Sequence, residues 1–362
     1  MKALRAFFEM TALSLLPLLV LLLSLAGPRR AAAREGGQAL AAAAHVPSAA
    51  PAAEPAPTPA MPAAETVPEV ETAPASMDEA FRVDILFGTA VRSLSLREYL
   101  VGVVAAEMPA SFEAAALEAQ AVAARTDTLY RLTVSHPHRE AACCTDPGCC
   151  KAWASPEDLR ARWGDDYDRW LAKIAAAVDA TDGEILLYED EPIFAAFHAA
   201  SAGRTEDSEN VWTAALPYLR SVVTEETAAR VPGFCRSTVF TEAELAARVR
   251  ESVPGAELTG DPGGWLADVR RSDSGRLLSV SVGGVTLSGT AFRSLLGLRS
   301  AAVTWTREDG AFRFDTEGFG HGVGMSQYGA EVMAEEGCGC AEILFHYYTG
   351  VRLGDMSEVF PA

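Results

Sequence analysis

The region from residue 31 to residue 78 restricts the fold most, because it contains little that a hydrophobic core could bury. Alanine, proline, glutamate and threonine dominate it, as in AAEPAPTPAMPAAETVPEVETAPAS. This composition is typical of a disordered, semi-extended linker. A packed domain must therefore form from residues 79–362. The linker is expected either to hold that domain away from a membrane or to be a tail without a spacing role.

The first 30 residues have the pattern of a targeting or anchoring segment. Lys2 and Arg5 precede an apolar run from Met10 to Ala26. This length suits both a short membrane span and the core of a signal peptide. Because no clear cleavage motif ends the run, we favour an uncleaved N-terminal hydrophobic helix over a removed signal. Both options export the bulk of the chain.

The net charge of −19 at pH 7 argues against a nucleic-acid-binding surface. A phosphate backbone is bound by clustered lysine and arginine side chains. We therefore expect no nucleic-acid partner, and we interpret most of the acidity as solvated surface.

Residues 79–362 mix strand and helix patterns without a regular strand–helix–strand repeat, which predicts an α+β fold. FRVDILFGTAVRSLSL alternates apolar and polar residues around a Gly-Thr turn and predicts a hairpin. Ser95 and Glu98 have the spacing of a capping box, at the start of a helix that Pro109 ends. One further helix is expected from about residue 111 or 113, and another over residues 156–181.

Three segments combine small residues with reactive side chains. In LVGVVAAEMP a single carboxylate, Glu107, lies between an apolar run and a proline. The second segment, FHAASAGRTEDSENVW, contains Ser201 and Arg204. The third, GFGHGVGMSQYGA, has five glycines in thirteen positions. Glycine at this density lets the backbone approach a ligand, and a helix N-terminus behind it favours a polar or anionic group.

Together these segments resemble the SpoIID family, the stage II sporulation protein D group of peptidoglycan-degrading enzymes. The resemblance covers about residues 81–353 and implies a two-lobed catalytic domain with a substrate groove. The matching stretches, in order, are LREYLVGVVAAEMPASFEAAALEAQAVAARTDTLY, FHAASAGRTE, VWTAALPYLRSV, LSGTAFRSLLGLRS and GFGHGVGMSQYGAEVMAEEGCGCAEILFHYYTG.

The resemblance implies a lytic transglycosylase, which cleaves the bond from N-acetylmuramic acid to N-acetylglucosamine and leaves a 1,6-anhydro sugar. The catalytic glutamate of the family corresponds to Glu107. The implied partners are peptidoglycan glycan strands without stem peptides, a cell-wall amidase and the membrane scaffold of the sporulation machinery. The implied location is the mother-cell membrane during engulfment, with the catalytic domain outside the cytoplasm.

A single carboxyl group suffices for this reaction. Ordinary glycoside hydrolysis uses two carboxylates, whereas in a lytic reaction the C6 hydroxyl of the substrate attacks the anomeric carbon. Burial among Val103, Val104, Ala106 and Met108 is expected to raise the pKa of Glu107 and keep it protonated near neutral pH. The alternative is an exposed glutamate at a helix C-terminus, an unfavourable place for a negative charge.

Further candidates for substrate binding come from the same segments: Arg125, Ser201, Arg204, His321, Gln327 and Tyr328. Arg125 is expected to contact the substrate, with a structural ion pair as the alternative. His321 is either a second acid–base group or a ring that shapes the groove. Ala202 stands where the SpoIID pattern has a glycine, which leaves the backbone geometry near Ser201 open.

Four of the seven cysteines lie in CCTDPGCC, residues 143–150, shortly after two histidines. The Asp-Pro-Gly turn would bring the thiol pairs together, which suits zinc or a disulfide across the turn. The resemblance implies a zinc on His138, Cys144, Cys149 and Cys150, with Cys149 where the family has histidine. We favour a closed, structural zinc that takes no part in catalysis.

Two other functions stay open. The first is a non-catalytic, glycan-binding scaffold of the cell-wall remodelling complex. The second is a zinc cell-wall amidase, which is disfavoured because a catalytic zinc keeps an open position and avoids a shell of thiolates.

Overall fold

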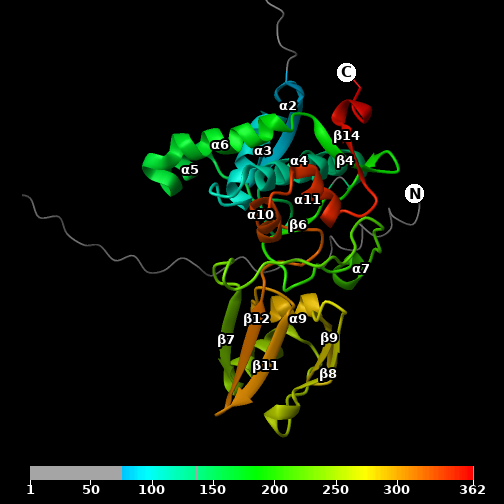
Figure 1. Cartoon of the computed structure of the whole chain (residues 1–362). Coiled ribbons are helices and arrows are strands. Elements are labelled where there is room, and N and C mark those ends of the chain that lie inside the picture. The colour runs from blue at the N-terminus through cyan, green and yellow to red at the C-terminus, as the bar shows by residue number, and fades with distance from the viewer. Residues whose placement is uncertain (1–75, 136, 362) are drawn as a thin grey trace, which may run out of the picture. The chain divides into compact units, whose positions relative to one another are not determined.

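The computed structural model describes residues 76–135 and 137–361 (Figure 1). The predicted anchor, residues 1–30, and residues 31–75 of the predicted linker lie outside this part. No helix in the described ranges is both long and apolar enough to cross a membrane. The backbone N–H groups of Met77 and Asp78 both donate to the Asp182 carboxylate at 2.9 Å. The folded part therefore begins before residue 79, the predicted boundary.

The predicted α+β class is confirmed, since helices and five small sheets are mixed along the described chain. The α-helices are α2 (Met77–Ala80), α3 (Leu96–Glu107), α4 (Ala114–Tyr130), α5 (Pro156–Trp163), α6 (Tyr167–Ala180), α7 (Ser208–Val211), α8 (Glu242–Ser252), α9 (Gly289–Leu296), α10 (Gln327–Glu335) and α11 (Cys340–Tyr347). The strands are β1 (Arg82–Phe87), β2 (Ala90–Ser95), β3 (Cys143–Cys144), β4 (Glu184–Tyr188), β5 (Glu191–Pro192), β6 (Phe197–His198), β7 (Cys235–Thr241), β8 (Leu266–Arg271), β9 (Leu277–Val282), β10 (Val285–Ser288), β11 (Val303–Glu308), β12 (Ala311–Glu317), β13 (Met325–Ser326) and β14 (Arg352–Asp355).

The predicted hairpin is the antiparallel pair β1–β2, in which Phe87 is opposite Ala90. The hydroxyl of Ser95 accepts from the N–H of Glu98 and caps α3. α3 ends at Glu107 because the residue before a proline is driven out of the helical region. Met108 accordingly has the extended angles φ −121° and ψ 147°. The carboxylate thus lies on the last helical residue, directly before the extended Met108.

Helix α4 is the centre of the first hydrophobic core. Almost all of its residues from Ala116 onward are buried, and it packs against α3, α6, α10 and α11. Its many alanines allow these neighbouring helices to approach closely. Because this helix is buried on all sides, its polar side chains must find partners inside the protein.

The single helix predicted over residues 156–181 is wrong. The chain forms α5 and α6, joined by a short 3₁₀ turn at Gly164–Asp166. Gly164 adopts φ +53°, which stops α5, because glycine takes positive φ at little cost. The amphipathic pattern continues across this break, so periodicity alone did not indicate it.

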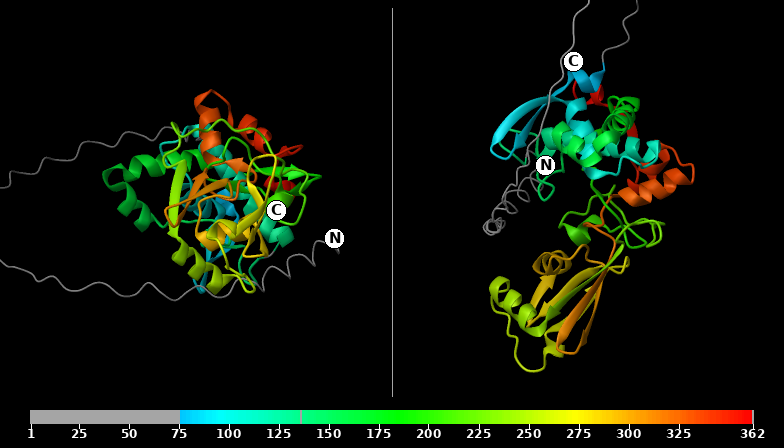
Figure 2. Two further views of the ribbon diagram at one scale, coloured as in Figure 1. Left: turned by 90° about the horizontal axis from the view of Figure 1, so that it is seen from below. Right: turned by 90° about the vertical axis from the view of Figure 1, so that its left-hand side faces the viewer.

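A second hydrophobic core lies between the sheet β11–β12–β7, the sheet β10–β9–β8 and helices α8 and α9 (Figures 1 and 2). Phe292, Phe312 and Phe314 are its largest fully buried side chains. Both cores belong to one compact unit of the chain. The substrate groove of a two-lobed domain stays a prediction.

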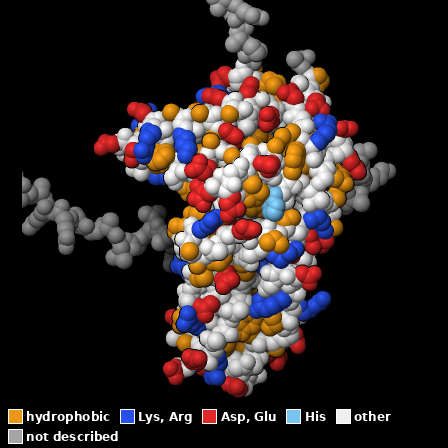
Figure 3. All heavy atoms as spheres, in the orientation of Figure 1, with side chains coloured by type: hydrophobic (Ala, Val, Ile, Leu, Met, Phe, Trp, Pro, Cys, Tyr) orange, Lys and Arg blue, Asp and Glu red, His pale blue; other side chains and the backbone are white. Residues whose placement is uncertain are grey.

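Two distant segments of the sequence pair through very short strands. β6 and β13 are parallel, with Phe197 opposite Met325 and His198 opposite Ser326. This pairing places the predicted Ser201 segment beside the predicted glycine-rich segment. On the face drawn in Figure 3, acidic and basic side chains are interspersed rather than gathered into one charged area.

Candidate active site

Glu107 is half-buried at the end of α3, and two donors from distant segments hold its carboxylate. The N–H of Ala152 donates to Oε1 at 2.8 Å, and the Gln327 side-chain amide approaches Oε2 at 3.5 Å. Gln327 also donates to Oε1 of Gln120 on α4, at 3.3 Å. The side chain of Glu107 therefore has a defined orientation before any substrate binds.

Burial raises the pKa of Glu107 above its ordinary value of 4.5, because the carboxylate loses hydration. The N–H of Ala152, the amide of Gln327 and the charge of Lys151 act in the opposite direction. The loss of hydration is the largest effect. Glu107 therefore keeps its proton to a higher pH than an exposed glutamate, as a general acid requires.

A buried network behind Glu107 positions Gln327. Gln327 is the first residue of α10, and it is preceded by Ser326, whose hydroxyl accepts from the N–H of Gly329. Ser326 donates to Oε1 of Glu226 at 2.6 Å, and the N–H of Ser201 donates to the same oxygen at 2.6 Å. Glu226 thus ties the start of α10 to the Ser201 segment.

Ser201 belongs to this network rather than to an open surface. It has no exposed area, and its hydroxyl lies 2.6 Å from Nε2 of His198. Nδ1 of His198 lies 3.2 Å from the carbonyl of Val323, so the ring bridges two segments. The prediction that Ser201 contacts the substrate is wrong in this structure, because its polar atoms are bound inside the protein.

Arg125 is also completely buried and does not face a substrate. Its guanidinium pairs with Asp78 at 2.5 Å, and Asp78 is 1% exposed. It donates in addition to the backbone carbonyl of Glu184 at 3.0 Å. The expected substrate contact is therefore wrong, and the structural ion pair is what the structure shows. Because α4 is buried, a charged side chain on it requires an oppositely charged partner inside the protein.

His321 is part of an aromatic group and is neutral near pH 7. Its ring lies 5.1 Å from Trp212 and 5.5 Å from His198, and Nδ1 accepts from the N–H of Val323. Burial and the charge of Arg293 lower its pKa to about 4. His321 lines one cavity with Lys151 and a second cavity with residues of the β8–β9 region.

The two other substrate-binding candidates lie apart from each other. Tyr328 packs edge-on against Phe112, with ring centres 5.0 Å apart, directly beside Gln327 in the sequence. Arg204 is half-buried and donates to the hydroxyl of Ser221 at 3.4 Å. The structure therefore joins Gln327 to Glu107, whereas no hydrogen bond connects the side chain of Tyr328 or Arg204 to Glu107 in the described part of the chain.

The predicted metal-ligand residues converge. The ligand atoms of His138, Cys144, Cys149 and Cys150 all lie within 4.8 Å of one another. Nε2 of His138 is 3.3 Å from the sulfur of Cys150 and 3.6 Å from that of Cys149, and these sulfurs are 3.9 Å apart. A tetrahedral zinc with ordinary bond lengths separates its N and S ligands by about 3.5–3.8 Å. All cysteines of the described ranges are free thiols, so the alternative disulfide is absent from the described structure.

The cysteine cluster is connected to Glu107 through two residues. Cys150 is followed by Lys151, whose ammonium group pairs with Asp127, and then by Ala152, whose N–H binds Glu107. A ligand that holds Cys150 therefore also fixes residues 151 and 152, which orient the carboxylate of Glu107.

Sequence reasoning missed the internal partners of the site, namely Gln120, Ala152, His198 and Glu226. Gln120 has no exposed area and lies among the buried apolar residues in the middle of α4. A polar residue on such a face signals a buried hydrogen bond. The sequence carries no such signal for the N–H of Ala152, because every residue type except proline has a backbone N–H.

Comparison with known proteins shows that the chain is similar to stage II sporulation proteins. A family model described as SpoIID, Stage II sporulation protein, matches residues 88–188. The chain is 39% identical over 271 residues to Stage II sporulation protein D of Bacillus amyloliquefaciens, across 74% of this chain and 76% of that protein. It is 38% identical over 268 residues to the protein of that name from Bacillus subtilis (strain 168), across 73% and 76%. It is 27% identical over 301 residues to the Bacillus subtilis protein named Amidase enhancer, across 70% of this chain and 40% of that protein.

Proposed function

Because the chain belongs to the stage II sporulation protein D family, we propose that it is a peptidoglycan lytic transglycosylase of sporulation. The observation that carries this proposal is the environment of Glu107. One half-buried carboxyl group with a raised pKa lies between an amide N–H and a glutamine side chain. This arrangement suits a single acid–base group.

Glu107 would carry both proton transfers. In its protonated form it donates to the glycosidic oxygen, and the bond from the anomeric carbon of N-acetylmuramic acid breaks. The C6 hydroxyl of the same sugar attacks that carbon and closes the 1,6-anhydro ring. The hydroxyl proton passes to the Glu107 carboxylate, which restores the acid. No water molecule is consumed, so a second carboxylate to activate water is not needed.

Oxygen labelling tests this mechanism directly. Glycan strands without stem peptides are incubated with the protein in ¹⁸O-enriched water, and the products are analysed by mass spectrometry. We expect anhydro ends without label. Labelled reducing ends would instead indicate hydrolysis, and binding without any product would indicate a glycan-binding scaffold. Release of peptides that stops on chelation would indicate a zinc amidase.

The pH dependence provides a second test, through Gln327. Its amide stabilises the charged form of Glu107 and so lowers the pKa of this residue. Gln327→Leu is expected to raise that pKa further. Because the reaction starts from the protonated acid, activity falls as pH rises through the pKa of Glu107. The variant should therefore move the alkaline limb of kcat/KM to higher pH.

The matched control for this test is Glu335→Gln, an exposed residue at the far end of the same helix α10. This variant should leave the alkaline limb of the kcat/KM profile at the same pH as in the wild type. If the alkaline limb also stays unchanged in Gln327→Leu, its assignment to Glu107 is contradicted.

We propose that the cysteine cluster binds a structural zinc. The four N and S ligands fill a tetrahedral shell, so the ion would brace residues 138–152 and leave no position for a reactant.

Metal analysis of the purified chain should find about one zinc ion per molecule. Cys149→Ser should lose the metal, whereas Cys235→Ser, an exposed cysteine outside the cluster, should retain it. A chain without metal that contains reactive cluster thiols would contradict the proposal.

The location and partners follow from the same family membership. We propose that residues 1–30 anchor the chain in the mother-cell membrane and that the catalytic domain faces the forespore. Peptidoglycan glycan strands are the proposed substrate. A cell-wall amidase and the membrane scaffold of the sporulation machinery are the proposed protein partners.

A further inference from the structure

Arg276, which directly precedes β9, is buried without a hydrogen-bond partner for its side chain. It is 2% exposed, and none of its three guanidinium nitrogens has an acceptor among the described residues. Burial lowers its pKa only to about 10, so the side chain is charged at neutral pH. Because an isolated buried charge is unfavourable, buried guanidinium groups are normally paired. A group that accepts these hydrogen bonds and neutralises the charge is therefore expected beside Arg276.

The carboxylate of Glu206 lines the same cavity as Arg276 but does not pair with it. No hydrogen bond joins the two side chains in the described ranges, although the charge of Glu206 acts on Arg276 from nearby. Both oxygens of Glu206 already accept hydrogen bonds at 2.5–3.0 Å from neutral donors: the N–H of Asp207, the amide of Asn210 and the hydroxyls of Ser272 and Ser274. The donors of Arg276 are therefore left for another acceptor.

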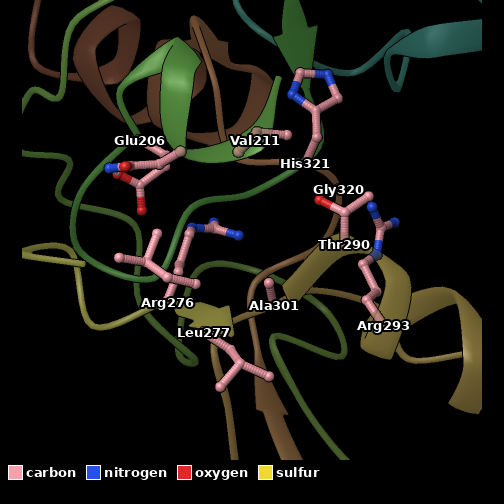
Figure 4. Close-up of a pocket in the computed structure, with 11 residues that line it drawn as sticks. Glu206, Val211, Arg276, Leu277, Thr290, Arg293, Ala301, Gly320 and His321 are labelled. Carbon is pink, nitrogen blue, oxygen red and sulfur yellow. Dashed lines mark hydrogen bonds between the residues drawn. The ribbon is translucent and has the colours of Figure 1, made fainter. Parts of the chain in front are cut away.

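Arg293 and Thr290 line this cavity together with Arg276 (Figure 4). A methyl group added to Gly322 would lie 2.4 Å from Cζ of Arg276, so the guanidinium packs directly against the backbone of the glycine-rich segment. The cavity is the space in which a further acceptor can reach it. Because Thr290 is exposed, a small ion can enter the cavity from solvent.

The volume of the cavity, about 20 Å³, restricts its ligand to one small particle. A single water molecule needs about 10–15 Å³ of such space. Sulfate, phosphate and carboxylate groups on a larger molecule are too big, whereas a chloride ion is only slightly larger than water. A water molecule would accept hydrogen bonds but would leave the charge of Arg276 without a counter-charge.

The side chains that line the cavity have an excess of one positive charge. Arg276 and Arg293 are positive, Glu206 is negative, and His321 is neutral near pH 7. Glu226 acts on Arg276 from outside the cavity lining, and its effect is smaller than that of Glu206. One monovalent anion therefore balances the charge of the lining, and a metal cation would be repelled.

We propose that this cavity binds one chloride ion, which accepts hydrogen bonds from Arg276 and lies between Arg276 and Arg293. The role of the ion is structural. Arg276 begins the approach to β9 and packs against Gly322, so an ion held there fastens the β8–β9 hairpin to the glycine-rich segment. The site does not depend on the reaction proposed for Glu107.

Thermal unfolding tests the site in solution. Sodium gluconate is replaced stepwise by sodium chloride at constant ionic strength, and the Tm of the full-length chain is followed. We expect a saturable rise in Tm, with the equilibrium constant for unfolding lowered about tenfold at a chloride concentration ten times Kd. Bromide should act like chloride, whereas acetate should not, because it is too large for the cavity. A Tm that chloride does not raise, or that acetate raises equally, overturns the proposal.

Two variants separate the site from a general effect of salt. Arg276→Gln should lose the saturable rise in Tm. Arg270→Gln, an exposed position on β8 of the same hairpin, should retain it. An equal rise in Arg276→Gln would show that chloride acts elsewhere and would overturn the site.

Anomalous diffraction locates the ion without any variant. Crystals of the wild-type protein are soaked in sodium bromide, and the anomalous difference map is calculated. A bromide peak beside the guanidinium of Arg276 supports the proposal, and water alone at this position overturns it. This measurement decides the question even if Arg276→Gln does not fold.

Discussion

Glu107→Gln is expected to lower the rate of anhydro-product formation by about 10²–10⁴-fold, the range for loss of a general acid. Glutamine has nearly the same shape and can still bind Gln327, but it cannot donate a proton to the glycosidic oxygen. The fold should be retained, because Glu107 is only half-buried and has no ion-pair partner in the described chain. Product formation is measured on peptide-free strands, together with the thermal unfolding curve of each variant.

The control for this prediction is Glu98→Gln, an exposed glutamate in the first turn of the same helix α3. It removes an equal charge without touching the site and should leave the rate unchanged. Full activity of Glu107→Gln would exclude this residue as the acid.

Arg125→Met is expected to destabilise the protein by about 3–5 kcal/mol, the range for removing one partner of a buried ion pair. Asp78 would remain at 1% exposure without its guanidinium. Arg97→Met is the matched control, because Arg97 pairs with Asp179 at 2.6 Å while the two side chains are 34% and 48% exposed. Solvent screens this surface pair, so its loss should change the free energy of unfolding by about 0–1 kcal/mol. Urea unfolding of the full chain measures both.

A double variant, Asp78→Leu with Arg125→Met, separates pairing from packing. It leaves no unpaired buried charge and should be more stable than Arg125→Met alone. Normal stability of Arg125→Met together with weakened binding of glycan strands would restore the substrate role that the sequence predicted.

Local signals in the sequence were reliable where neighbours along the chain decide the structure. The hairpin β1–β2 and the end of α3 before Pro109 formed as predicted, and of the predicted capping box the bond from the Glu98 N–H to the Ser95 hydroxyl formed. Each depends on contacts within a few residues or on the steric effect of one proline. The break at Gly164 was missed, because glycine permits a positive φ without requiring it.

The roles of Arg125 and Ser201 could not be predicted in the same way. Arg125 pairs with Asp78, 47 residues earlier, and Ser201 binds Glu226, 25 residues later. A charged or polar residue in a functional-looking segment has the same sequence pattern whether its partner is a substrate or another side chain. Only the packing around it distinguishes the two.

The sequence by itself determined the mixed α+β class, the family and the four candidate metal ligands, which converge in the structure. These depend on composition, on local periodicity and on motif spacing, which a chain carries before it folds. The tertiary structure alone decided which polar groups are buried and with whom they pair. Gln327 lies 220 residues from Glu107 and Ala152 lies 45 residues away, yet both contact its carboxylate. The pKa of Glu107 depends on this packing, because burial removes water from the carboxylate only after distant segments have come together.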